Sequence, residues 1–326
     1  MLSNLIFLSN ESVNTDVLLS FIIPTYKNRK FLISAIDSIL SQDTELNDTV
    51  EIIVVSNNTE DSMEDLIDRY HECKIQIKLY RNQENYGQVG NINQGVSLAK
   101  GKYVSFIHDD DLILPNFLTE MCEYIENPKQ DYPCIVPSFY MMDETYHYDL
   151  KHRIMSAIFG FRFLYRHKIQ IIRPQDCIRT FHDVYSAPTC GTIFLKKAII
   201  EYGFFKNERG AAWDYYNYRQ FNKIYDVYLL HRFVGIRRTE TGMSNEEKVQ
   251  REFQEDRKQM AEIELKNNKY IQKYKSAILT KKPFLKYLFF RVKAGIYFYT
   301  HNLDSKLGIS KQLFTKYGKM QKDSNI

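Results

Sequence analysis

The stretch LLSFIIPTYKNRKFLISAIDSILSQ, residues 18–42, joins a short apolar run to a segment with helical spacing. The run at residues 18–24 is almost continuously apolar and ends at Pro24, which is typical of a buried strand. In the following segment, apolar residues recur on one helical face: Phe31, Leu32, Ala35, Ile36, Ile39 and Leu40. We therefore expect a strand that leads directly into a helix.

The same order of elements recurs along the first half of the chain. Further strands are predicted at residues 50–55, 75–80 and 102–107, with a helix at 62–70 and a loop that leads into a short helix at 87–101. Strands that alternate with helices favour an α/β fold with a doubly wound, mostly parallel sheet and flanking helices. In such sheets, ligands bind beyond the carboxyl ends of the strands.

The second half has a less regular pattern. Shorter elements are expected before residue 245: a strand at 134–142, a strand and helix closed by Gly203 at 191–205, a short helix at 211–221 and a strand at 226–230. A long charged helix follows them. The predicted organisation is one domain over residues 17–245 and a helical, basic and aromatic C-terminal extension over residues 246–326.

Composition and charge indicate a globular chain with a basic tail. The 326 residues are 44% hydrophobic, with only 13 Gly and 8 Pro, which argues against disorder. From Lys266 onward there are 14 basic residues against two acidic ones, whereas the rest of the chain has 30 basic and 38 acidic residues. Such a tail predicts attraction to an anionic surface, either membrane or nucleic acid. A solvated helical face is the alternative.

The cysteines and the N-terminal sequence indicate the cellular compartment in which the protein is expected to act. Five cysteines, an odd number without any C-x-x-C spacing, argue against a disulfide framework and against a structural zinc site. The first residues lack the basic region of a signal peptide, and no apolar stretch approaches the roughly 18 residues of a spanning helix. We expect a cytoplasmic protein.

Three consecutive carboxylates follow the predicted strand at 102–107, in the stretch YVSFIHDDDLILPNF. Because like charges and burial both raise carboxyl pKa values, Asp109, Asp110 and Asp111 require an offsetting cation. Carboxylates on a tight turn are suitable ligands for Mg²⁺ or Mn²⁺, which would in turn hold a diphosphate leaving group. The alternatives are a solvated acidic turn or a cap for the following helix.

These motifs together, each at the end of a predicted strand, closely resemble family 2 glycosyltransferases of the GT-A fold. The resemblance is strong over LSFIIPTYKNRKFLISAIDSILSQ, VEIIVVSNN and NYGQVGNINQGVSLAKGKYVSFIHDDDLILPNF, to about residue 120. It continues more weakly through GTIF, WDYY and GIRRTETGMS to about residue 245. It implies an inverting transferase that uses Mn²⁺ or Mg²⁺ and a nucleoside-diphosphate sugar, with UDP the preferred nucleotide.

The resemblance also implies roles for residues in the nucleotide pocket. Three residues at the end of the first strand would line it, with the tyrosine near the base: Pro24, Thr25 and Tyr26. After the second strand, Asn57 and Asn58 stand where the family usually has a carboxylate. An Asn carbonyl could accept a hydrogen bond from a uracil or thymine N–H.

Further implied roles concern the diphosphate and the metal. Gly87, Asn91 and Asn93 would fall in a loop beside the diphosphate, where Ile92 replaces a frequent arginine. In the acidic motif, Asp110 is the first choice for the metal ligand and Asp109 for the ribose, with Asp111 close to the metal. His108 stands where many relatives begin this motif with Asp.

The catalytic base is expected further along the chain. Asp214, in WDYY, matches a carboxylate that removes the proton from the acceptor hydroxyl; from spacing alone it would be a helix N-cap. Gly191 would let the backbone approach the sugar. Arg237 would contact the diphosphate, whereas Thr239 replaces a histidine of the family pattern.

The basic and aromatic tail (281–299) and the insertion at 154–165 lead to the hypothesis of a lipid-linked glycan acceptor and an anionic membrane surface, with no nucleic-acid partner. A helix that packs its aromatic face on the body is the alternative. The protein would then lie on the inner face of the membrane and serve surface polysaccharide synthesis. Two rival functions remain: a catalytically silent binding subunit, and another α/β nucleotide enzyme such as a nucleotidyltransferase or dehydrogenase, whose glycine-rich signature is absent.

Overall fold

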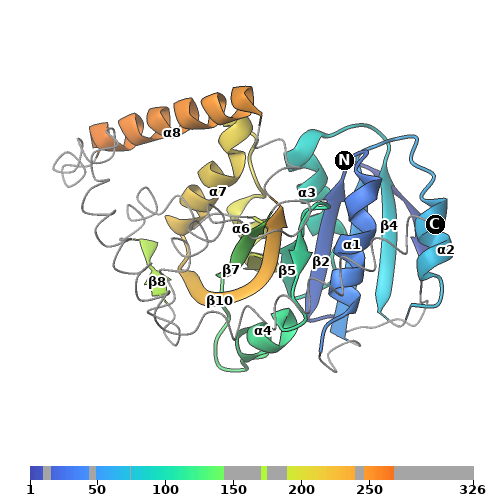
Figure 1. Cartoon of the computed structure of the whole chain (residues 1–326). Helices are drawn as coiled ribbons and strands as arrows, with labels where there is room; N and C mark the ends of the chain where they lie inside the picture. Colours follow the sequence, from blue (N-terminus) through green and yellow to red (C-terminus); the bar gives the residue numbers. More distant parts are fainter. Residues whose placement is uncertain are drawn as a thin grey trace.

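The computed structural model describes residues 1–9, 16–43, 49–73, 75–142, 170–174, 189–238 and 246–267. These residues form a ten-stranded sheet in the order β1-β4-β3-β2-β5-β9-β7-β10-β6, with β8 paired to β10. Helices cover both faces of this sheet (Figure 1). The expected mixed α/β fold is confirmed.

The centre of the sheet comes from the first half of the chain. Four parallel strands lie in the order β4-β3-β2-β5: β2 (Leu19–Thr25), β3 (Val50–Ser56), β4 (Gln76–Asn82) and β5 (Tyr103–Phe106). All four were predicted. An additional strand, β1 (Ser3–Leu8), pairs antiparallel with β4 at the sheet edge, so the predicted domain start at residue 17 leaves out one strand.

The second half adds antiparallel pairing. Strand β9 (Ile193–Leu195) runs antiparallel between β5 and β7 (Cys134–Met142), and β7 is parallel to the long β10 (Val227–Arg238). Two short strands complete the sheet by antiparallel pairing with β10: β6 (Leu112–Ile113) and β8 (Gln170–Ile172). The parallel region is therefore the centre, and the sheet as a whole is mixed.

The helices divide between the two faces according to the strand residues they cover. One face carries α1 (Arg29–Leu40), α2 (Glu64–Tyr70) and α4 (Phe117–Ile125). The other carries α3 (Gly87–Leu98), α6 (Lys196–Tyr202) and α7 (Trp213–Asn222), which follows a 3₁₀ turn, η4 (Gly210–Ala212). The prediction of a loop before the third helix is wrong, because α3 begins at Gly87.

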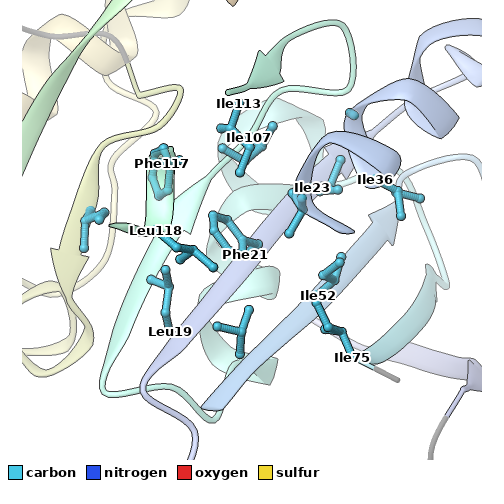
Figure 2. Packing of buried hydrophobic residues seen from close by; sticks show 14 of the residues in the cluster. Leu19, Phe21, Ile23, Ile36, Ile52, Ile75, Ile107, Ile113, Phe117 and Leu118 are labelled. Carbon is cyan, nitrogen blue, oxygen red and sulfur yellow. The ribbon is translucent and has the colours of Figure 1, made fainter. Parts of the chain in front are cut away.

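Successive side chains along a strand point to opposite faces of the sheet, so each strand contributes to the hydrophobic core on either face. In β2, Phe21 and Ile23 face the side of α1 and α4, while Ile22 between them faces α3, as expected for a strand buried on both sides. Figure 2 shows the first of these clusters, where Phe21 packs on Phe117 with ring centroids 5.6 Å apart. Each fully buried side chain of this size contributes roughly 1.5–3 kcal/mol. The cores therefore hold the strand ends, and the polar residues beyond them, in fixed positions.

The C-terminal extension is described only in its first part. Helix α8 (Glu247–Asn267) confirms the predicted charged helix and packs on η4 and α7 through Met260 and Phe253 (Figure 1). The predicted basic and aromatic segment at 281–299 and the insertion at 154–165 lie outside the described residues. Among the described helices, none combines the length and the apolar content that crossing a bilayer requires.

Candidate functional site

The carboxyl ends of β2 and β5 meet at the acidic turn. Asp109 accepts hydrogen bonds from the Thr25 hydroxyl at 2.6 Å and from the Asn28 side-chain amide at 3.1 Å. Thr25 ends β2, and the turn that holds Asp109 follows β5 directly. Burial raises the pKa of Asp109, and the two donors oppose that rise. The sequence placed Thr25 and Asp109 in one pocket, and the structure joins them directly.

Arg238, at the end of β10, binds this turn through both its backbone and its side chain. Its backbone amide donates to Asp111 Oδ1 at 3.0 Å, and its guanidinium donates to the carbonyl oxygen of Asp110 at 2.7 Å. The guanidinium also lies 4.3 Å from the ring centroid of Phe31, and the side chain is buried. The sequence pattern predicted a divalent metal ion as the offsetting charge and did not indicate Arg238 as a site residue.

The second oxygen of Asp111 faces a different group of residues. Asp111 Oδ2 lies 3.6 Å from His108 Nδ1, and the Cys190 thiol lies beside both. The other ring nitrogen of His108 is 3.0 Å from the Thr189 hydroxyl. Burial raises the pKa of Asp111 and raises that of the Cys190 thiol well above its ordinary range. Neither His108 nor Cys190 was predicted as a site residue.

Asp214 lies in the first turn of α7, within electrostatic reach of the acidic turn. The helix N-cap is Ala212, so the interpretation of Asp214 as the cap is wrong. Its carboxylate accepts the backbone N–H of Tyr215 at 2.7 Å. Burial raises the pKa of Asp214, and the charges of Arg237 and His108 lower it. Arg237 and His108 also lower the pKa of Asp111, so Asp214, the acidic turn and Arg237 lie within electrostatic reach of one another.

Asn57, after β3, is the centre of a hydrogen-bond network within the protein. Its carbonyl oxygen accepts from Asn82 at 2.9 Å and from the backbone of Tyr86 at 3.1 Å, while its amide donates to Asn85 at 2.8 Å and to the backbone oxygen of Gly87 at 3.0 Å. Asn58 is less buried. Contact of Asn57 or Asn58 with a base stays a prediction, and the structure adds that Asn57 holds the start of α3 to the sheet.

A carboxylate from further along the chain lies near Asn57 and Asn58, where the expected carboxylate is missing. Asp61 accepts a hydrogen bond from the Ser56 hydroxyl at 2.9 Å and forms an ion pair with Arg29. Arg81 also donates to the backbone oxygen of Asp61 at 3.0 Å. A carboxylate therefore stands beside the end of β3, although it is supplied from five residues further along the chain.

Helix α3 lies where a loop beside the diphosphate was expected, and several of its residues pack in the core or bind neighbouring backbone. Ile92 is fully buried in the core below α3, which accounts for an apolar residue at this position. Asn93 pairs with the backbone of Phe205, donating at 2.9 Å and accepting at 3.1 Å. Asn91 donates to the backbone oxygen of Val55 at 3.0 Å. The expected place of Asn93 beside the donor diphosphate stays a prediction in addition to this structural role.

The backbone at Gly191 lies against the ring of Phe139. It has φ +69°, in the region that favours glycine, and a Cβ at this position would lie 2.1 Å from the Phe139 ring. A Cβ on Gly235 would meet the same ring at 2.1 Å. The space that a Cβ on Gly191 would take is therefore filled by Phe139, and the approach of a sugar to this backbone stays a prediction.

The remaining pocket residues differ in exposure. Tyr26 is 49% exposed, so its ring is available for stacking on a base, whereas Pro24 is half-buried. Arg237 is half-buried at the end of β10. The roles of Pro24, Tyr26 and Arg237 toward a donor stay predictions.

The donor set of the acidic turn fits a hard divalent cation. Asp110 is half-exposed, and both its neighbours in the turn present carboxylate oxygens, the ligands that Mg²⁺ and Mn²⁺ prefer. The two carboxylate oxygens of Asp109 accept hydrogen bonds from the Thr25 hydroxyl and the Asn28 amide, and one oxygen of Asp111 accepts from the Arg238 backbone amide. The role of Asp110 as the first metal ligand stays a prediction.

Comparisons with known proteins show the family to which the chain belongs. The family model described as glycosyl transferase family 2 matches residues 20–201. An uncharacterized glycosyltransferase MJ1057 of Methanocaldococcus jannaschii is 31% identical over 129 residues, which is 39% of this chain and 43% of that protein. The GalNAc(5)-diNAcBac-PP-undecaprenol beta-1,3-glucosyltransferase of Campylobacter jejuni is 36% identical over 107 residues, 32% of this chain and 33% of that protein. The matched segments thus span less than half of these relatives.

Solved structures share the fold at low sequence identity. TarS of S. aureus, in complex with UDP-GlcNAc, aligns with a TM-score of 0.57 and 17% identity over 81% of this chain and 70% of that one. The mannosyltransferase PcManGT from Pyrobaculum calidifontis, with GDP-Man and Mn²⁺, aligns with a TM-score of 0.54 and 14% identity over 93% of this chain and 83% of that one. These likenesses establish the expected GT-A fold. With more than half of its length matched by the family model, the chain belongs to glycosyl transferase family 2.

Proposed function

We propose that this chain is a metal-dependent, inverting glycosyltransferase that moves a sugar from a nucleoside diphosphate to an acceptor hydroxyl. The observation that carries the proposal is the acidic turn after β5, which is fixed to the ends of β2 and β10 through Thr25 and Arg238. Burial raises the carboxyl pKa values of Asp111 in this turn and of Asp214 at the start of α7, and Arg237 opposes both rises, which supports one shared site. A carboxylate base and a cation-binding turn are the two parts that direct displacement from a sugar diphosphate requires.

Each part has a defined task in a single displacement. Asp214 accepts the proton of the acceptor hydroxyl while that oxygen attacks the anomeric carbon, and the bond to the nucleoside diphosphate breaks on the opposite side. Asp110 would hold Mn²⁺ or Mg²⁺ with Asp109 and Asp111 beside it. When bound, the cation neutralises charge on the departing diphosphate. Arg237 adds a positive charge at the same place, and the Tyr215 N–H orients the Asp214 carboxylate.

For the donor, we propose a nucleoside-diphosphate sugar with UDP as the first nucleotide to test. Among the structural neighbours, TarS is in complex with UDP-GlcNAc and PcManGT with GDP-Man and Mn²⁺. Asp61 beside Ser56 and the exposed ring of Tyr26 offer a carboxylate and a stacking surface for a base and ribose. The identity of the sugar depends on residues outside this set.

For the acceptor, we propose a glycan, lipid-linked and presented at the cytoplasmic face of a membrane during surface polysaccharide synthesis. The names of two relatives point this way: the C. jejuni undecaprenol glucosyltransferase and the minor teichoic acid biosynthesis protein GgaB of Bacillus subtilis. The basic composition after Lys266 supports attraction to anionic lipid. Cosedimentation of the full chain with phosphatidylglycerol vesicles at low salt tests this part, and equal recovery with neutral vesicles would refute it.

The central experiment is titration calorimetry of the protein with UDP- and GDP-sugars in the presence and absence of Mn²⁺. Cation-assisted binding of one donor is expected, followed by slow metal-dependent hydrolysis of that donor when no acceptor is added. Binding without any turnover over a long incubation would favour a catalytically silent binding subunit. Absence of binding for every donor would overturn the proposal.

A further inference from the structure

His108, Asp111 and Cys190 form a compact group at the inner side of the acidic turn. One candidate ligand atom from each residue, an imidazole nitrogen, a carboxylate oxygen and a thiol sulfur, lies within 4.8 Å of the other two. In tetrahedral zinc sites with bonds of about 2.0–2.3 Å, ligand atoms are spaced by roughly 3.3–3.8 Å. A closure of about 1 Å would therefore bring these three atoms to a common centre.

Only one oxygen of the carboxylate in this group has a hydrogen bond of regular geometry within the protein. Asp111 is 1% exposed, and its Oδ1 takes the Arg238 amide. Oδ2 has no partner of regular geometry among the described residues, and the Cys190 thiol, itself a member of the group, is the side chain that interacts with this carboxylate. A buried polar atom left without a partner costs roughly 1–3 kcal/mol, so such atoms usually have an unseen water or ion beside them. This observation points to a ligand at Oδ2 independently of the cluster geometry.

The surroundings orient the other two groups toward the same point. The His108 ring nitrogen Nε2 is 3.0 Å from the Thr189 hydroxyl, which leaves Nδ1 on the side of Asp111. Cys190 is 2% exposed and is held by a bridge to Phe106, while Gly191 donates to the Phe106 carbonyl oxygen at 2.6 Å. An outer hydrogen bond that fixes a ligating ring is a general feature of metal sites.

From these observations we propose that His108, Asp111 and Cys190 form a binding site for a borderline-soft divalent cation of the Zn²⁺ type. A nitrogen, oxygen and sulfur set favours Zn²⁺ over Mg²⁺, which takes oxygen ligands. The site is distinct from the hard-cation position at Asp110, although both use the same turn. Three protein ligands leave a fourth position open, and the His108 side chain is 24% exposed.

The sequence argued against a structural zinc site because no C-x-x-C spacing is present. That argument covers only ligands that are neighbours in the chain. Here the histidine and the carboxylate follow β5, whereas the cysteine precedes β9, and antiparallel pairing of β5 with β9 brings them together. A metal at this point would tie the acidic turn to the backbone around Gly191.

The test uses the full-length, reduced protein, stripped with chelator and titrated with Co²⁺ as a spectroscopic substitute for Zn²⁺. We expect one equivalent of Co²⁺ to produce a thiolate-to-cobalt absorption band in the near ultraviolet, which Zn²⁺ then displaces. Cys190→Ser should abolish the band, and His108→Ala should weaken Co²⁺ binding at least about tenfold. Cys122→Ser, which removes a half-buried thiol on α4, is the matched control and should keep the band.

Two outcomes would overturn the proposal: a Co²⁺ spectrum without a thiolate band, or a band that persists in Cys190→Ser. Circular dichroism of each variant establishes that it is folded before titration. Asp110→Asn separates this inference from the proposed function, because it should weaken Mn²⁺-assisted donor binding and leave the cobalt band unchanged. The band therefore reports on the site even if no donor sugar binds.

Discussion

The backbone amide of Arg238 donates to the Asp111 carboxylate at 3.0 Å, which joins the last residue of the longest strand to the acidic turn after β5. The Arg238 guanidinium continues this connection to the carbonyl oxygen of Asp110 and covers the face of Phe31. Three segments far apart in the sequence thus fix one turn. This connection gives the carboxylates a defined geometry before any ligand binds.

Replacing Arg238 by Met should lower the free energy of unfolding by roughly 1–3 kcal/mol, because the Asp110 carbonyl loses a charged donor and Phe31 loses its covering cation. Urea denaturation measures the change. Arg232→Met is the control: Arg232 is 33% exposed and pairs with Glu120, so its loss should cost less than about 1 kcal/mol. Equal costs for the two variants would contradict a fixing role for Arg238.

Replacing Asp214 by Asn should reduce kcat for sugar transfer by about 10²–10⁴-fold, since an amide cannot accept the proton of the acceptor hydroxyl. Donor affinity, measured by calorimetry, should stay unchanged. Asp256→Asn on α8 provides a matched control and should retain activity. A fully active Asp214→Asn enzyme would remove Asp214 from the role of base.

The pH dependence of transfer should follow the environment of Asp214. Burial raises the carboxyl pKa of Asp214 above the ordinary value of about 3.9. Because only the ionised carboxylate accepts a proton, kcat/KM should rise with pH as Asp214 ionises, and this rising limb of the pH profile should lie above that ordinary value. The Arg237 charge lowers this pKa, so Arg237→Gln should move the limb to higher pH. Arg237→Lys keeps the charge and should leave the limb nearly in place. A limb that moves to lower pH in Arg237→Gln would refute the assignment.

Replacing Asp110 by Asn should remove most of the dependence of donor binding on Mn²⁺, because the half-exposed carboxylate of the turn is lost. Calorimetric titration of the donor with and without Mn²⁺ gives the effect, and at least a tenfold loss of cation-assisted affinity is expected. Asp131→Asn is a suitable control, since Asp131 forms an exposed pair with Lys102 on another part of the surface. Unchanged Mn²⁺ dependence in Asp110→Asn would place the hard cation elsewhere.

A buried ion pair at the opposite ends of the same strands predicts a large effect on stability. Lys78 lies 2.5 Å from Glu51, both are buried, and Glu51 also accepts from the Ser20 hydroxyl at 2.6 Å. Lys78→Met should cost roughly 3–5 kcal/mol because it leaves an uncompensated buried charge. Lys102→Met, at an exposed pair, should cost less than about 1 kcal/mol by thermal denaturation. Similar costs for both would contradict a stabilising role of the Lys78–Glu51 pair.

The sequence by itself determined the order of elements in the first half of the chain. Alternating apolar runs and helical spacing are local patterns, so β2, α1, β3, α2, β4 and β5 follow from neighbours in the chain. The same patterns placed Thr25 and Asp109 at strand ends that a parallel sheet brings together. The edge strand β1 was missed, because a short strand whose pairing partner is distant has little signal of its own.

Only the tertiary structure decided which groups complete the site. Arg238 reaches the acidic turn because β10 returns beside β6 and β7, and Cys190 reaches Asp111 because β9 pairs with β5. Phe139 fills the space above Gly191 for the same reason, since its strand lies next to β9. These contacts depend on pairing between segments that are distant in the sequence, and the spacing of residues along the chain does not predict such pairing. The local pattern therefore specified the strands and their ends, while long-range strand pairing specified the chemistry between them.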